Sequence, residues 1–362
     1  TQYRYRLDGG AWNAITPVAT PIALTLVEGS HTLELVGCDT WGNWQSTDSP
    51  TTYTWTVDTT APGDGQITGQ PGESTSATGT DITIGGAGIT AYRYSLDGGQ
   101  TWSGPYGVGT HLTLADLGEG QHVLWIQVQD AAGNWQTTYT PITWTVDTTP
   151  PVIHVTAAPP TPTNQTALTV NLVSGEDATH YRFDLDGSGY GSSTPVGTAI
   201  NLSGLADGAH TLRIIGQDAA GNWQAAASAT VLTFVVDTQS PLATVGQTPD
   251  DPTSATSIDL IVGGDGVVAY RYRLDSGEYG AETPVATHVA ESGLSDGVHH
   301  VFVIGRDAAG NWQSESGPTT VSWTVDTLSP LATVTGVPDS PTNSDAATLT
   351  VSGNGVTHYQ DR

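Results

Sequence analysis

Aspartate and asparagine residues recur at the joints between repeated segments of this chain. Asp147 and Asp237 each stand four residues before a proline, and the motif Asp-Ala-Ala-Gly-Asn occurs in the segment that follows. Calcium takes about six to eight oxygen ligands, and carboxylate and amide side chains supply such oxygens. The pattern predicts a candidate calcium site at each of two joints, formed by Asp147, Asp177, Asp218 and Asn222 at the first and by Asp237, Asp265, Asp307 and Asn311 at the second.

The same motif also makes a good turn without any metal. Aspartate accepts hydrogen bonds from nearby backbone amides, and glycine or asparagine adopts a positive φ. The joint after Asp58 has no acidic residue in the corresponding loop, residues 85–88. Both interpretations stay open, and no cofactor other than calcium is expected.

One histidine per repeat follows a turn and begins a strand. A zinc site needs about three or four converging ligands, which single histidines in separate repeats cannot supply. We therefore expect a structural role for them. No nucleophile elbow, phosphate loop or Ser-His-Asp arrangement recurs, so the chain is not expected to be an enzyme. These histidines are His31, His122, His210 and His299.

Two sets of aromatic residues also recur once per repeat. The first set alternates with polar residues near the end of each repeat, which predicts core packing: Trp55, Trp144, Phe234 and Trp323. The second set follows the Gly-Asn turn, where packing at the turn and stacking on a glycan are the alternatives: Trp44, Trp135, Trp223 and Trp312.

These residues are positioned by a repeat that contains the motif Tyr-Arg-Tyr-Ser-Leu-Asp-Gly-Gly, which starts at Tyr92. Its aromatic-polar alternation before a glycine turn is typical of a β-strand entering a hairpin. The Leu-Asp pair falls at Leu7, Leu96, Leu185 and Leu274, at intervals of 89 residues. Short alternating runs separated by turns predict an all-β fold of tandem immunoglobulin-like, Greek-key β-sandwiches. Single proline-containing joints predict an extended rod.

The period divides the chain into three complete domains and two partial ones. The head is expected to carry strands C to G, including a strand at Ile22–Leu26, and the tail strands A, B and the start of C. Each end therefore has what the other lacks, and Thr357–Arg362 duplicates the position of Thr1–Arg6. The expected limits are 1–60 for the head, 61–149, 150–239 and 240–328 for the complete domains, and 329–362 for the tail.

The repeated phrases YxYxLDGG, DAAGNWQ and YTWTVDTTAP resemble the tandem bacterial immunoglobulin-like repeats of large secreted or surface-anchored adhesins. The resemblance covers the whole chain. It implies an extracellular or cell-surface stalk, often stiffened by calcium, and it implies no particular ligand.

Composition limits the partners. The chain has 36 acidic residues against nine arginines and no lysine, for a net charge of −27. Nucleic acids and anionic membranes bind basic surfaces, so neither is expected as a partner. No segment reaches the length of a membrane span. The sequence has no methionine, so we expect Thr1 to follow processing or the chain to be an excerpt.

Cys38 is the only cysteine, so no intrachain disulfide can form. Its counterparts in the later repeats are Gln129, Gln217 and Arg306, which predicts an exposed position. An unpaired thiol and an intermolecular bridge are the two alternatives.

Three functions compete. The first is a structural subunit of an extracellular filament, whose copies join head to tail by completing each other's split domains. The second is an adhesin stalk that binds a glycan or protein, and the third is a passive spacer. For the filament, the expected interface residues are Tyr3, Tyr5, Leu24, Leu26, Leu33, Leu35, Trp55, Leu331, Val334, Leu349, Val351 and Tyr359.

Overall fold

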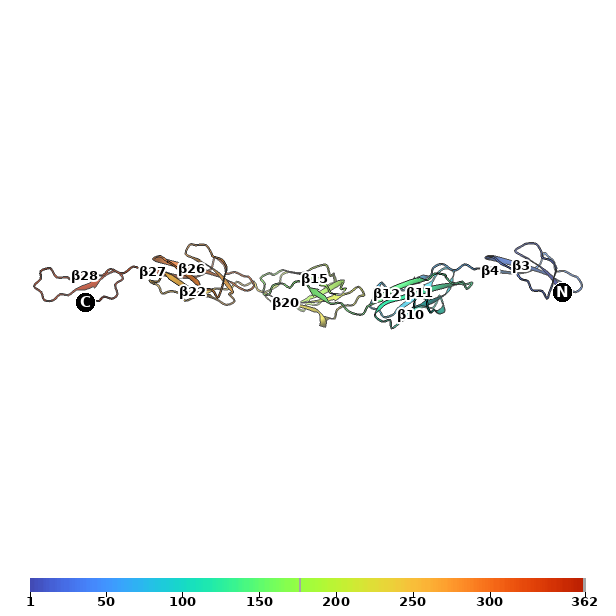
Figure 1. The fold of residues 1–362 in the computed structure, drawn as a ribbon, viewed down its shortest axis with the longest axis horizontal. Helices are drawn as coiled ribbons and strands as arrows, with labels where there is room; N and C mark the ends of the chain where they lie inside the picture. Colours follow the sequence, from blue (N-terminus) through green and yellow to red (C-terminus); the bar gives the residue numbers. More distant parts are fainter. Residues whose placement is uncertain (176, 361–362) are drawn as a thin grey trace. The chain divides into compact units, whose positions relative to one another are not determined.

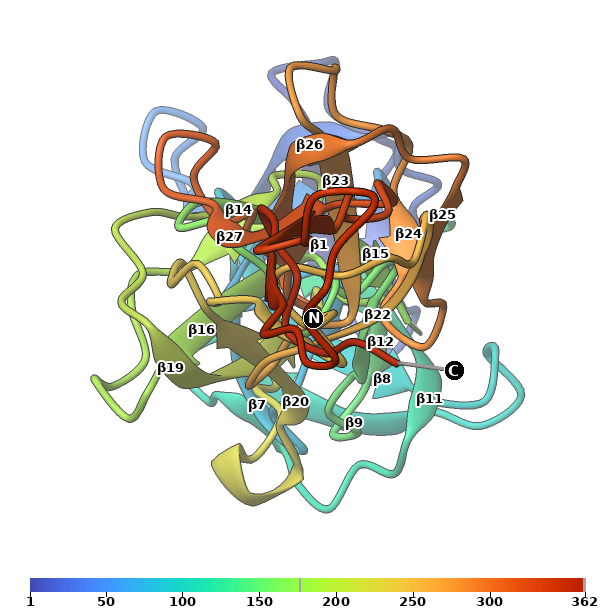
Figure 2. The same cartoon turned by 90° about the vertical axis from the view of Figure 1, so that its left-hand side faces the viewer.

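The computed structural model describes residues 1–175 and 177–360, and its ribbon is shown from two directions (Figures 1 and 2). These residues form β-strands joined by turns, and the single helical segment among them is the 3-10 turn η1 (Ala226–Ser228). The predicted all-β fold class is therefore confirmed. The chain divides into two compact units, residues 1–152 with 174–181 and 215–228, and residues 153–173 with 182–214 and 229–362.

The head forms one sheet without a second sheet against it. Its strand order is β2-β1-β3-β4. Tyr3 of the first strand pairs with Gly37, and Leu33 pairs with Tyr53 of the last strand, all antiparallel. The strands are β1 (Gln2–Leu7), β2 (Thr16–Pro17), β3 (Gly29–Cys38) and β4 (Thr51–Val57).

The strand expected at Ile22–Leu26 does not form, and that prediction is wrong. In each complete repeat the corresponding strand pairs with a B strand, as Leu112 of β10 (Leu112–Leu114) pairs with Ile82. The head has no B strand, so the backbone of residues 22–26 has no ladder to join. The side chains still alternate, with Ile22, Leu24 and Leu26 more buried than their neighbours.

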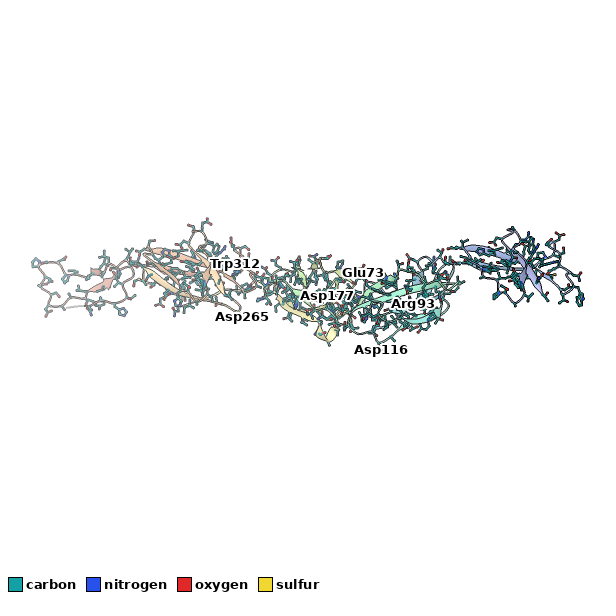
Figure 3. The ribbon with its side chains drawn as sticks, turned by 45° about the vertical axis from the view of Figure 1, so that its right-hand side comes forward. Glu73, Arg93, Asp116, Asp177, Asp265 and Trp312 are labelled. Carbon is teal, nitrogen blue, oxygen red and sulfur yellow. The ribbon has the colours of Figure 1, made fainter. Side chains whose placement is uncertain are left out.

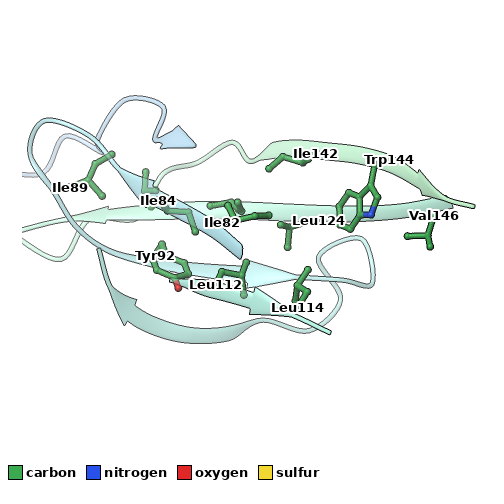
Figure 4. Packing of buried hydrophobic residues seen from close by; sticks show 12 residues of the cluster. Ile82, Ile84, Ile89, Tyr92, Leu112, Leu114, Leu124, Ile142, Trp144 and Val146 are labelled. Atoms are coloured by element: carbon green, nitrogen blue, oxygen red, sulfur yellow. The ribbon is translucent and has the colours of Figure 1, made fainter. Parts of the chain in front are cut away.

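The second repeat is a complete two-sheet sandwich. One sheet has the order β10-β7-β5 and the other β6-β12-β11-β8-β9, which are the two sheets of an immunoglobulin-like fold. Alternate residues of both sheets point inward and form the core, where Ile82, Tyr92, Leu124 and Trp144 are buried (Figure 4). The strands are β5 (Gln66–Thr68), β6 (Ser74–Thr75), β7 (Thr80–Gly85), β8 (Ile89–Ser95), β9 (Ser103–Gly107), β10, β11 (Gly120–Asp130) and β12 (Thr140–Val146).

The third repeat has the same two layers, with its B strand broken in two at Asn171. The pairs β13-β15 and β14-β18 lie in one layer, and the sheet β17-β16-β19-β20 forms the other. The strands are β13 (Ile153–Val155), β14 (Leu168–Val170), β15 (Leu172–Ser174), β16 (His180–Leu185), β17 (Thr194–Pro195), β18 (Ile200–Leu202), β19 (Gly208–Gln217) and β20 (Thr230–Val236).

The fourth repeat consists of two sheets, β21-β22-β25 and β24-β23-β26-β27, that pack face to face. Leu260, Tyr270, Val303 and Trp323 are buried between them. The strands are β21 (Thr244–Gly246), β22 (Ser257–Gly263), β23 (Ala269–Leu274), β24 (Thr283–Pro284), β25 (Val289–Ser292), β26 (Gly297–Arg306) and β27 (Thr319–Val325).

The tail forms a single pair of strands, β28 (Thr333–Thr335) and β29 (Thr350–Ser352). Its register is that of the fourth repeat, since Val334 pairs with Val351 as Val245 pairs with Val262. Residues 357–360, the expected start of strand C, form no strand, and Asp361 and Arg362 lie outside the described residues.

In each complete sandwich, the segment before the B strand pairs in parallel with the last strand of the repeat. The sequence did not indicate this pairing, which we call the parallel edge. Ser74 and Thr75 of β6 pair in parallel with the end of β12, and isolated parallel bridges join Thr163 to Val236 and Thr253 to Val325. The segment before each B strand therefore contributes to both sheets. The five domain limits and the extended rod stay predictions.

Candidate functional site

The head leaves the apolar face of its sheet partly exposed. Leu33, Leu35 and Trp55 are only partly buried. The residues at the same positions of the second repeat are buried: Leu124, Ile126 and Trp144. Tyr53, on the same face, is 63% exposed, whereas its counterpart Ile142 is 8% exposed. This face has the composition of a sandwich core but no opposing sheet.

An open pocket lies at one end of this face. Its volume is about 390 Å³, and Tyr3, Ile22, Leu35 and Cys38 contribute to its lining. In the complete repeats the residues at the position of Ile22 are buried: Leu112, Ile200 and Val289. The pocket therefore occupies space that a B strand fills elsewhere. Cys38 is partly buried, not exposed as its polar counterparts indicated.

The tail presents the complementary apolar side chains. Leu349 is 53% exposed, whereas Leu260 at the same position of the fourth repeat is fully buried. Val351 is partly buried, and its counterpart Val262 is buried. Leu331 differs from these residues, since its counterpart Leu242 is itself exposed in a complete domain.

The strand C position of the head is already occupied. Tyr3 of β1 is buried, Tyr5 is partly buried, and the Tyr3 hydroxyl donates a 2.6 Å hydrogen bond to the carbonyl oxygen of Thr20. Tyr270 makes the same bond to Thr287 in the fourth repeat. Tyr359, the duplicate of Tyr3, is exposed in the tail. A tail that docked on this face would therefore leave its residues 357–362 outside the core.

The joints are bridged by asparagine side chains. Asn222 donates from Nδ2 to the carbonyl oxygen of Asp147 at 2.7 Å, and Asn311 makes the same bond to Asp237. Asn134 reaches the carbonyl oxygen of Asp58 at 2.9 Å. We call this bond, from the turn asparagine to the carbonyl of the preceding linker, the asparagine latch.

The aspartate of each turn holds the latch in place. The two carboxylate oxygens of Asp218 accept 2.8 Å hydrogen bonds from the backbone N–H and the Nδ2 of Asn222. Asp307 holds Asn311 in the same way. At Asp130, the hydrogen bonds from Asn134 lower the pKa of the carboxyl group.

The residues predicted to bind calcium are thus brought together only in part. Asp147 meets Asn222 through its backbone carbonyl and not through its carboxylate. Asp177 and Asp265 are exposed residues, labelled in Figure 3. Within the described residues, no three His, Cys, Asp or Glu side chains are grouped so that they could hold a metal ion. The latch joins residues that are 74–76 positions apart in the sequence, so no local pattern indicated it.

Three of the four recurrent histidines bond to the aspartate in the turn that follows the first strand of the sheet. His210 Nδ1 lies 2.7 Å from Asp186 Oδ2, and its Nε2 lies 2.9 Å from the carbonyl oxygen of Ala206. Both ring nitrogens face acceptors, so the imidazolium form satisfies both bonds. The Ala206 carbonyl and then Asp186 raise the pKa of His210. His31 and His299 have the same two kinds of partner.

The two aromatic sets have different surroundings. Trp144, Phe234 and Trp323 are buried, which confirms core packing for the complete repeats. The second set lies beside arginines of the sheet: Arg4 over Trp44, Arg93 over Trp135 and Arg271 over Trp312, at 4.4–5.5 Å from the ring centres (Arg93 and Trp312 are labelled in Figure 3). Such cation–π pairs account for these tryptophans as packing residues.

Known proteins are similar to the chain at low coverage or at low identity. No family model matches the chain. Chitinase A1 from Niallia circulans is 32% identical over 150 residues, an alignment that covers 38% of this chain; the chain spans about a fifth (21%) of that relative's length. None of the described helical segments is long and apolar enough to cross a membrane.

Solved structures of repeat proteins are similar to the chain at low identity. A tetra-tandem repeat from the extending region of a large adhesion protein is 19% identical with a TM-score of 0.35, covering 90% of this chain and 92% of its own. A Ca²⁺-stabilized, ice-binding adhesin of an Antarctic bacterium is 20% identical with a TM-score of 0.34, covering 90% of each chain. Fibronectin(III)-like modules of CbhA from Clostridium thermocellum are 16% identical with a TM-score of 0.32, covering 48% of this chain and 94% of their own.

Proposed function

We propose that the chain is a non-catalytic structural subunit of an extracellular or cell-surface filament, whose copies join head to tail by strand complementation. The observation that carries this proposal is the exposure of Leu349 in the tail beside the full burial of Leu260 in the fourth repeat. The tail holds an apolar strand that a complete domain buries, and the head holds the apolar face that would bury it.

The apolar side chains supply part of the binding free energy. Burying about five of them, such as Ile22, Leu35, Trp55, Leu349 and Val351, contributes about 8–15 kcal/mol at ~1.5–3 kcal/mol each. Association costs about 4–15 kcal/mol. Backbone hydrogen bonds of the added strands must therefore contribute, as they do in β-strand addition. Because the two surfaces differ, repeated contacts extend as a fibre unless the rotation closes a ring.

We propose a smaller interface than the one expected from the sequence. Val334 has a partly buried counterpart, Val245, that packs against the core of the fourth repeat. Leu331 has the exposed counterpart Leu242, so we leave it out of the interface.

An adhesin stalk is the second candidate, and Trp41 favours it. This side chain is 85% exposed in the turn where the second repeat has Ala132. An exposed aromatic ring can stack on a sugar or anchor a protein contact. If Trp41 is a binding residue, Trp41→Ala should abolish retention on a glycan array or on cells without changing the association of the chain. A passive spacer would show neither retention on glycans or cells nor self-association.

Sedimentation velocity of the full chain over a range of concentrations tests the filament. We expect the mean mass to rise with concentration. Leu349→Asp should abolish this rise, because it places a charge at the position where Leu260 is fully buried. Leu331→Asp is the matched control, and it should associate like the wild type. A chain that stays monomeric at every concentration would rule out strand complementation.

A further inference from the structure

We infer that the head accepts residues 330–353 of a second copy in one fixed register, the register that residues 241–264 have in the fourth repeat. This inference rests on the proposed function, and it specifies which residues meet. Polar groups set the register, because apolar side chains alone would tolerate a slip of two residues along the strand.

The first polar contact is a pair of hydrogen bonds to the backbone of a single alanine, which we call the alanine clamp. In the fourth repeat, Ala243 is buried, its N–H donates to Oε1 of Gln313 at 2.9 Å, and its carbonyl oxygen accepts from Oγ1 of Thr319 at 2.6 Å. A shift of the strand would leave both backbone groups of this buried residue unpaired, which is costly. The clamp therefore fixes the first strand relative to the sheet.

The head has the glutamine and the threonine of this clamp. Gln45 donates from Nε2 to the carbonyl of Ser49 at 2.9 Å and to Oγ1 of Thr51 at 3.3 Å. Gln313 makes the same two bonds to Gly317 and Thr319. These bonds orient the amide so that its Oε1 faces away from them. The tail residue at the position of Ala243 is Ala332, which is exposed.

The second contact is the parallel edge. In the fourth repeat, the N–H of Thr253 donates to the carbonyl of Thr324, and the N–H of Asp326 donates to the carbonyl of Thr253, both at 2.9 Å. Thr163 makes the same pair of bonds in the third repeat. Thr342 is the corresponding tail residue. It would bond to Thr56 and Asp58, at the end of β4.

The third contact is a fourth asparagine latch. Asn43 of the head is already held by Asp39, through 2.8 Å bonds to its backbone N–H and its Nδ2. At the three existing joints, an asparagine held in this way donates to the carbonyl of the preceding linker. In the docked pair, that carbonyl is Asp326 of the second copy.

The donor strands already have the required geometry. The tail pairs Thr333 with Ser352, as the fourth repeat pairs Thr244 with Gly263. In that repeat Asp259, which lies on the solvent side, is directly opposite Ala290. The inferred register therefore places Thr348 of one copy opposite Ala23 of the other.

Mixed single-cysteine chains test this register. In a Cys38→Ser background, one chain carries Ala23→Cys and the other Thr348→Cys, and the mixture is oxidised. Directly opposite residues of antiparallel strands have Cβ atoms about 4.5–5.5 Å apart, close to what a disulfide needs. We expect a covalent heterodimer. The control replaces Thr348→Cys by Thr350→Cys, two residues further along the strand, and should lose that product.

The outcomes separate the two proposals. A heterodimer from the Ala23–Thr348 mixture alone supports the register. Equal yields from both mixtures, or association in the centrifuge with no heterodimer from either, would overturn the register and leave the filament standing. No association and no heterodimer would overturn both. Gln45→Leu gives a second readout, because loss of the clamp should weaken association without changing the fold of the complete repeats.

Discussion

The Nδ2 atom of Asn222 lies 2.7 Å from the carbonyl oxygen of Asp147, and so joins the turn of one repeat to the preceding linker. The same bond occurs at Asn311 and, slightly longer, at Asn134. Each asparagine is held by its own aspartate, so the bond needs no further ordering of the side chain. Each of these turns therefore supplies the side chain that bonds to the preceding linker.

Asn222→Ala should loosen the joint that follows Asp147 without unfolding either neighbouring repeat. One such hydrogen bond contributes about 0.5–1.5 kcal/mol. We expect faster hydrogen exchange of the peptide that covers residues 147–152 and unchanged exchange in β11. Asn43→Ala, in a Leu349→Asp chain, is the control, because Asn43 Nδ2 bonds to Asp39 and to no linker carbonyl among the described residues. Unchanged exchange at residues 147–152 would show that the bond does not hold the joint.

Calcium should leave the thermal unfolding of the chain unchanged. Asp218 uses both carboxylate oxygens to hold Asn222, and the atom that Asn222 presents to the linker is a donor nitrogen. A calcium ion at this joint would have to displace those bonds. Calorimetry with calcium and with a chelator measures the effect. A calcium-dependent rise in the unfolding temperature that Asp177→Asn removes would instead support a metal at the joint.

The strands and the core followed from the sequence because alternation is a local signal. Tyr92 and Trp144 lie in the core for the reason their spacing indicated, since every second residue of a strand points to the same face. The absence of a strand at Ile22–Leu26 could not be predicted from these residues alone. A strand there would have to pair with a B strand, and residues 1–60 form none. The asparagine latch and the alanine clamp involve residues more than 60 positions apart. They depend on how the repeats fold and on no local pattern.

Trp323→Phe should be tolerated. The indole N–H of Trp323 is buried and has no hydrogen-bond partner, and the third repeat places Phe234 at the same position. Removing an unpaired buried donor offsets part of the lost packing. We expect a cost below about 1.5 kcal/mol, against about 3–5 kcal/mol for Trp323→Ala. Calorimetry of the full chain gives the comparison, and equal losses for the two variants would contradict it.

The contribution of His210 to stability should depend on pH. Its partners raise the pKa of His210 above 6.5, so this contribution is complete below pH 6.5 and is lost as the pH rises through the raised pKa. The N–H of Thr211 and then His210 lower the pKa of Asp186 below 3.8, so the contribution of that carboxylate is present above pH 3.8 and is lost as the pH falls through the lowered pKa. The pair should therefore stabilise its repeat most between these two limits.

His210→Gln tests this window. Hydrogen exchange of residues 208–214 should be faster in the variant than in the wild type between pH 4 and 6.5, after correction for the intrinsic exchange rate, and the difference should shrink above the raised pKa. His122→Gln is the internal control. The aspartate at the corresponding turn of the second repeat, Asp97, bonds to Ser95 and Thr101, and His122 contacts the carbonyl of Gly118. A difference at His210 that stays constant with pH, or that His122→Gln reproduces, would show that the imidazolium–carboxylate pair is not the cause.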